Sequence, residues 1–68
     1  MIGKVKIIRA REGWGFVRTE DNKDVFFHQK DFTDGTSISD IQEGDRLGFE
    51  VSTNDRGFIA REIKRFID

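Results

Sequence analysis

Most of the information about the fold lies in two short stretches, GWGFV at residues 13–17 and VFFH at residues 25–28. In an extended strand successive side chains point to opposite faces, so alternate residues share a face. Trp14 and Phe16 therefore lie on one face of the first stretch. By the same rule the second stretch places one ring and its histidine on one face, and two apolar side chains on the other.

A turn centred near Asp21 would join the two stretches as an antiparallel hairpin. Trp14 then lies opposite His28, and Phe16 lies opposite Phe26. Directly opposed side chains in such a pair have Cβ atoms roughly 4.5–5.5 Å apart. We therefore predict a two-by-two block of flat rings on one face of the hairpin.

This block of rings has two possible orientations, toward the interior or toward solvent. The inward orientation would bury His28 without a partner and leave Val17, Val25 and Phe27 exposed. The outward orientation avoids both problems, and an exposed aromatic patch usually marks a binding surface. We therefore predict that the rings face solvent. The core expected from this choice consists of Val5, Val17, Val25, Phe27, Ile41, Leu47, Phe49, Val51, Ile59 and Ile63.

The rest of the chain consists of short strand-like runs separated by turn residues. The strands are expected at about residues 3–10, 14–20, 24–29, 46–53 and 58–66. Ser39 and Gln42 have the spacing of a capping box, which predicts one helical turn between the third and fourth strands. This pattern predicts an all-β fold, a five-stranded antiparallel OB-type barrel, formed by a single domain over residues 1–68.

Charge is abundant but balanced, with 12 basic and 13 acidic residues and a formal net charge of −1. A protein that bound nucleic acid mainly by neutralising phosphates should be clearly basic. Aromatic residues are the unusual feature, because seven Phe and one Trp occur in a chain without Tyr. Any affinity for nucleic acid must therefore come largely from stacking on aromatic rings.

Several function classes are excluded or disfavoured by composition. The chain has no Cys and only one His, which rules out disulfides, thiol catalysis, zinc fingers and multi-histidine metal sites. No catalytic triad or glycine-rich phosphate loop is present, so we expect no enzymatic activity, cofactor, metal or small-molecule substrate. No apolar run approaches the roughly 18 residues of a membrane span, and the start has no signal-peptide core. We therefore expect a cytoplasmic protein that does not act at membranes.

At the quoted stretches the chain resembles the cold-shock proteins and the cold-shock domain shared with the Y-box proteins. EGWGFV at 12–17 resembles the first ribonucleoprotein motif of that family, and DVFFH at 24–28 resembles the second. GKVK at 3–6 resembles the family's opening strand. Weaker similarities follow at 41–51 and from Arg56 to Ala60, so the resemblance spans nearly the whole chain.

The resemblance implies an OB-type barrel that binds single-stranded RNA or DNA with low sequence selectivity. Members of the family act as RNA chaperones, transcription antiterminators or translation modulators. By position, the stacking platform is Trp14, Phe16, Phe26 and His28, and Lys6 and Arg56 lie near the sugar–phosphate backbone. Arg9 lies close enough to the platform to touch phosphate. Phe58 stands where a proline is usual, and either covers the mouth of the barrel or adds a ring near Arg56.

Some positions depart from the family's pattern. Ile7-Ile8 replaces a usual Trp-Phe pair, Glu12 replaces a Lys, and Gln29 replaces a Phe found in many bacterial members. We therefore expect weaker or more selective binding than in a typical member. The same departures keep open a barrel of this type whose ring patch binds a protein partner or a second copy. A translation-factor OB domain with the same barrel is a lesser alternative, against which the paired ribonucleoprotein motifs argue.

Overall fold

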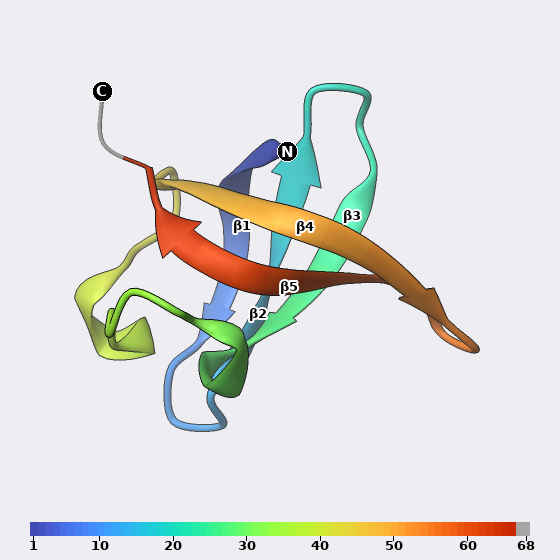
Figure 1. Ribbon diagram of the computed structural model, residues 1–68. Coiled ribbons are helices and arrows are strands. Elements are labelled where there is room, and N and C mark those ends of the chain that lie inside the picture. Colours follow the sequence, from blue (N-terminus) through green and yellow to red (C-terminus); the bar gives the residue numbers. More distant parts are fainter. Residues whose placement is uncertain (67–68) are drawn as a thin grey trace.

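Five strands form where the alternating pattern predicts them. The computed structural model describes residues 1–66, and each strand begins and ends within one residue of its expected bounds (Figure 1). Two 3₁₀ turns lie between the third and fourth strands. In chain order the elements are β1 (Ile2–Arg9), β2 (Trp14–Thr19), β3 (Asp24–His28), η1 (Gln29–Asp31), η2 (Ile38–Asp40), β4 (Arg46–Asn54) and β5 (Gly57–Arg65).

The strands close into a barrel in the order β1-β2-β3-β5-β4, which confirms the predicted fold class. Figure 1 shows the long β4–β5 hairpin running across the direction of β1, β2 and β3. All neighbouring strands are antiparallel except β3 and β5, which pair in parallel at Phe26 and Ile59. Strand direction cannot alternate all the way round a ring of five, so one parallel contact is required.

The barrel interior holds most of the predicted core, with Val17, Phe27, Leu47 and Ile63 completely buried. Val51 is only partly buried but packs against this core. Two hydrophobic residues that were not predicted to be core are also buried, Ile38 and Ala60. The full set of buried hydrophobic residues is Val5, Val17, Val25, Phe27, Ile38, Ile41, Leu47, Phe49, Ala60 and Ile63.

The prediction that Ile59 belongs to the core is wrong, because β5 does not alternate regularly. Glu62 has a φ of 50°, and the pairing of β4 with β5 shifts register in the same region. Such a bulge reverses which face the following side chains take. Ala60 and Ile63, three positions apart, therefore both point inward. Ile59 lies next to the inward-pointing Ala60 and so points to the outer face, where it pairs with Phe26.

The segment between β3 and β4 also differs from expectation at its turn. Ser37, and not Ser39, caps η2: its hydroxyl accepts a hydrogen bond from the Ser39 N–H at 3.3 Å. The turn begins earlier in the chain than expected, at Ile38. Burial of the Ile38 side chain in the core, where it is 4% exposed, fixes this position. Within residues 1–66, no helix is long and apolar enough to cross a membrane.

Candidate nucleic-acid interface

The β2–β3 hairpin has the predicted register, with Trp14 opposite His28 and Phe16 opposite Phe26. We call these four residues the ring block. The centroids of its three aromatic rings lie 5.7–6.0 Å apart, so each ring contacts both others. Trp14 and Phe26 are tilted by 31°, whereas Phe16 meets both edge-on, at 85° and 74°.

The ring block lies on the outer surface of the barrel, as predicted from the alternation. Val17, Val25 and Phe27 on the same two strands are buried, and the four members of the block are half-buried. Partial burial follows from the mutual ring contacts, since each ring covers part of its neighbours. What remains accessible is a compact aromatic surface of the kind on which nucleic-acid bases stack.

A bulge in β1 extends this surface on one side. The pairing of β1 with β2 shifts between Val5 and Ile7, so that Ile7 lies opposite Phe16 and Arg9 lies opposite Trp14. Arg9 is exposed and therefore lies where a phosphate beside a base on Trp14 could be reached. Sequence reasoning placed Arg9 near the platform, but the bulge that fixes it there was not foreseen.

A second aliphatic side chain extends the surface on the other side. Ile59 of β5 pairs with Phe26 of β3, so it lies beside that ring on the outer face. The outer surface therefore carries a continuous apolar row across four strands. In spatial order the row is Ile7, Phe16, Phe26 and Ile59.

His28 has a structural contact that orients its ring. Its Nδ1 accepts a hydrogen bond from the Lys30 backbone N–H at 3.1 Å, which caps η1. Because Nδ1 is the acceptor, the proton of the neutral imidazole lies on Nε2. Nε2 is thus a hydrogen-bond donor at the edge of the ring block, suited to a carbonyl oxygen of a base or a phosphate oxygen.

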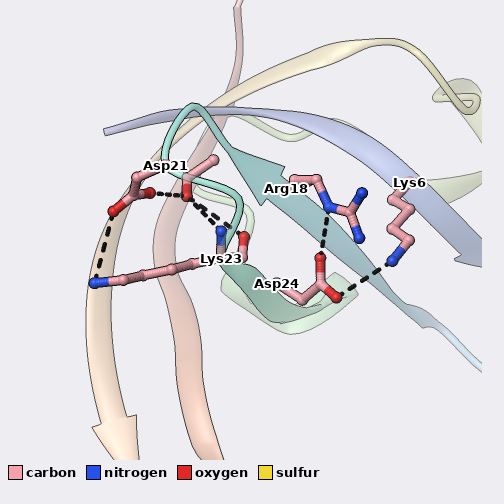
Figure 2. Close-up of polar contacts among 6 residues, drawn as sticks. Lys6, Arg18, Asp21, Lys23 and Asp24 are labelled. Atoms are coloured by element: carbon pink, nitrogen blue, oxygen red, sulfur yellow. Dashed lines mark hydrogen bonds and ion pairs between the residues drawn. The ribbon is translucent and has the colours of Figure 1, made fainter.

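Charged residues border the ring block at its Phe16–Phe26 edge, because Arg18 pairs with Asp24 two positions along the same two strands. Asp24 accepts hydrogen bonds from Arg18 Nε at 3.1 Å and from Lys6 Nζ at 3.3 Å, and Figure 2 shows both cations directed at this one carboxylate. The hydrogen bond from Arg18, then that from Lys6, lowers the pKa of Asp24. The candidate cation Lys6 is therefore already partnered, and Arg18 belongs to the same cluster.

Arg56 and Phe58 lie at the tip of the β4–β5 hairpin, where both are exposed. The Asn54 side chain accepts a hydrogen bond from the Arg56 N–H at 2.8 Å and so shapes the turn. Phe58 lies beneath the ammonium group of Lys23, 5.1 Å from the ring centroid. Within residues 1–66 Phe58 makes no ring contact with the ring block.

Gln29 has a role that its sequence position did not reveal. Its Nε2 donates to the Thr36 carbonyl at 3.0 Å, and its Oε1 accepts from the Ile38 N–H at 2.6 Å. One side chain therefore fixes the backbone on either side of Ser37, where η2 begins. A phenylalanine here could not make these hydrogen bonds. The departure from the family's pattern therefore removes an aromatic ring and adds two hydrogen bonds that hold the loop.

The fold and the site together define a class of protein: a small closed OB-type barrel with a cluster of aromatic rings on the outer face of two adjacent strands. Comparison with known proteins makes the class specific. The sequence profile described as the 'Cold-shock' DNA-binding domain matches residues 1–66, so the chain belongs to the cold-shock domain family. That family is one of nucleic-acid-binding domains.

Curated relatives are similar in sequence to this chain over nearly their whole length. The cold shock-like protein CspE of Bacillus anthracis is 35% identical over 63 residues, covering 93% of this chain and 92% of the relative. The major cold shock protein of Micrococcus luteus is 35% identical over 65 residues, covering 94% and 96%. Cold shock protein 1 of Lactiplantibacillus plantarum is 39% identical over 62 residues, covering 90% and 91%.

Proposed function

We propose that this protein binds single-stranded RNA or DNA by stacking bases on the ring block. The observation that supports this most directly is the cluster of three mutually contacting rings on the outer surface, with centroids 5.7–6.0 Å apart. Base stacking on such rings contributes about 1–3 kcal/mol per base and tolerates any base. The proposed cellular role is that of a cytoplasmic RNA chaperone or a regulator of transcription or translation.

Each candidate residue has a distinct part in this proposal. The faces of Trp14 and Phe26 receive bases, and Phe16 supports them edge-on. His28 Nε2 donates a hydrogen bond to a base or phosphate. Arg9 lies beside Trp14 and contacts the backbone. The further assignments are backbone contacts for Lys6 and Arg56, and an additional ring from Phe58.

Trp14 provides the test, because it is the only Trp in a chain without Tyr. Titration with a short oligothymidine and with an RNA of mixed sequence should quench or shift its fluorescence. Phe26→Ala should weaken binding about tenfold, in line with the loss of one stacked base. Glu43→Gln, an exposed position before β4, serves as the control and should bind like the parent protein. No fluorescence change at tens of micromolar strand would overturn the proposal.

A second candidate function is a protein-binding barrel with weak or lost nucleic-acid binding. Ile7 and Ile59, the aliphatic ends of the apolar row, favour this candidate, because they add hydrophobic surface and no charge. This candidate predicts self-association or partner capture that Trp14→Ala abolishes, with no response to oligonucleotide. Sedimentation velocity with and without oligonucleotide separates the two candidates.

A further inference from the structure

A second surface feature lies outside the ring block, along the outer side of β1. It is an open groove of about 700 Å³ whose lining includes Lys4, Lys6, Arg18 and Arg46. Among residues 1–66, Glu20 is the one carboxylate that lines it, and Phe66 also lines it. Four cations around one groove are a strong local concentration in a chain whose formal net charge is −1.

The groove continues directly from the ring block. Arg18 lies two positions after Phe16 on β2, a step of roughly 6.6 Å along the strand. Across the barrel, Asp24 pairs with Arg18, Arg18 with Lys4, and Lys4 with Arg46. At about 4.8 Å per strand, this row of charged residues runs beside the apolar row and passes from β3 over to β4.

An aromatic side chain lies at the end of this row. The Phe66 N–H donates a hydrogen bond to the Arg46 carbonyl at 3.0 Å, which fixes the backbone of Phe66 beside β4. The Phe66 side chain is 40% exposed, one of the larger exposed apolar groups in residues 1–66. Cations spaced along a groove together with an exposed ring are the combination that binds single strands.

The charges of the groove also argue against its pairing with a second copy of the chain. A two-fold contact places the same patch on both partners. It would therefore set Lys4, Arg46 and their neighbours against the same cations of the other copy, and facing like charges are unfavourable. A polyanion has the complementary charge. Within residues 1–66, Lys4 has no ion-pair partner, whereas Lys6 and Arg18 share Asp24.

We propose that a nucleic-acid strand held on the ring block continues along β1 into this groove. In this arrangement Lys4 and Arg46 contact backbone phosphates and Phe66 stacks on a base. Phosphates passing Asp24 compete with its carboxylate for Lys6 and Arg18. The proposal rests on the proposed function and extends it, because it defines a longer binding path than the ring block alone.

The test compares two oligonucleotides of different length. A strand of about 4 nucleotides is matched to the ring block, and a strand of about 10 also reaches the groove, both within the range of one OB barrel. The variants are Lys4→Gln, Arg46→Gln and Phe66→Leu, with Arg61→Gln on β5 as a cation control outside the groove. Far-ultraviolet circular dichroism and thermal unfolding establish that each variant is folded.

We expect the three groove variants to bind the short strand like the parent protein. Phe66→Leu should weaken binding of the long strand about tenfold, the loss of one stacked base. The salt slope for the long strand should be steeper than for the short one by about 1.4, and the two cation variants together should remove this difference. A long strand can bind in more registers than a short one, which raises its apparent affinity. The affinities of variant and parent are therefore compared as a ratio for each strand separately, so that this statistical factor cancels.

Three results would contradict the proposal in distinguishable ways. If both strands bind but the groove variants affect neither, the path is wrong and the proposed function stands. If neither strand binds the parent protein, the proposed function fails as well. If Phe66→Leu changes the sedimentation of the free protein and not the affinity for the long strand, the groove is an interface between proteins.

Discussion

Gly15 lies where β2 passes closest to both the neighbouring strand and the core. A Cβ at this position would meet the Ile7 carbonyl oxygen and would lie 2.7 Å from the Phe27 ring, which is itself completely buried. Neither neighbour can move away without disturbing the barrel. Gly15→Ala should therefore lower the free energy of unfolding by about 3 kcal/mol through overpacking. The loss in free energy of unfolding is measured by urea denaturation, with Trp14 fluorescence as the probe.

Gly48 on β4 provides the matched control for that substitution. A Cβ there would have only the Lys64 carbonyl oxygen nearby, at 4.0 Å, and no positive φ stands in the way. Gly48→Ala should be neutral or stabilise by about 0.5 kcal/mol, because alanine restricts the unfolded chain. Equal losses from the two substitutions would mean that the close packing around Gly15 is not what requires glycine.

The bulge in β1 gives Ile7 a position that can be tested by adding a ring. Ile7 lies opposite Phe16 in the apolar row, so Ile7→Phe would place a fourth aromatic ring beside the ring block. One more stacking surface contributes about 1–3 kcal/mol, so affinity for a short oligothymidine should rise about tenfold. The retained Trp14 fluorescence reports the titration. Ile7→Leu, which adds no ring, should leave affinity unchanged. A similar gain in affinity from both substitutions would mean that added hydrophobic surface, and not stacking, is responsible.

The segment between β3 and β4 is anchored by one carboxylate. Asp34 accepts hydrogen bonds from the Arg65 N–H at 2.8 Å and the Thr36 N–H at 3.0 Å. These bonds, that from Arg65 first, lower the pKa of Asp34 from 3.8 to about 2. Since the folded-state pKa lies below the unfolded value, the stabilisation is present above about pH 4. It is lost as the pH falls toward 2.

Asp34→Asn tests this anchor. At pH 7 the variant should be less stable by about 1 kcal/mol, a value near the low end for bonds to a charged group because the carboxylate is exposed. Thermal unfolding should show a melting temperature lower by about 4–8 °C. The difference between parent and variant should shrink between pH 4 and pH 2. A gap that stays constant over this range would show that ionisation of Asp34 does not contribute.

Strand positions and the hairpin register could be predicted because they depend on local alternation and turn residues. Trp14 opposite His28 follows from the position of one turn. The faces of Ile7 and Ile59 could not be predicted in this way, because each depends on a pairing with another strand: a bulge against β2 for Ile7 and the parallel contact with β3 for Ile59. The two hydrogen bonds of the Gln29 side chain could not be predicted either, because the backbone groups that it contacts are fixed in place only when Ile38 enters the core.

At the scale of the whole molecule, several cations lie next to the ring block, while many of the acidic residues lie in another segment of the chain. Arg9 lies beside the ring block, and Lys6 and Arg18 lie at its edge. Acidic residues are concentrated in the segment between β3 and β4, at positions 31, 34, 40, 43 and 45. A chain with a net charge of −1 can therefore still present a locally cationic surface. Attraction to phosphates depends on this local arrangement and not on net charge.

This arrangement predicts a shallow salt dependence for a strand that covers only the ring block. The proposed backbone contacts of such a strand are three, Arg9, Lys6 and Arg56, and the nearby Lys6 and Arg18 are already paired with Asp24. At about −0.7 per contact for single strands, the slope of log affinity against log salt should lie between roughly −0.7 and −2. Trp14 fluorescence titrations of a short oligothymidine at several salt concentrations measure it, with Arg9→Gln expected to reduce the slope by about 0.7. A slope steeper than about −3 would require more cations at the ring block than its geometry provides.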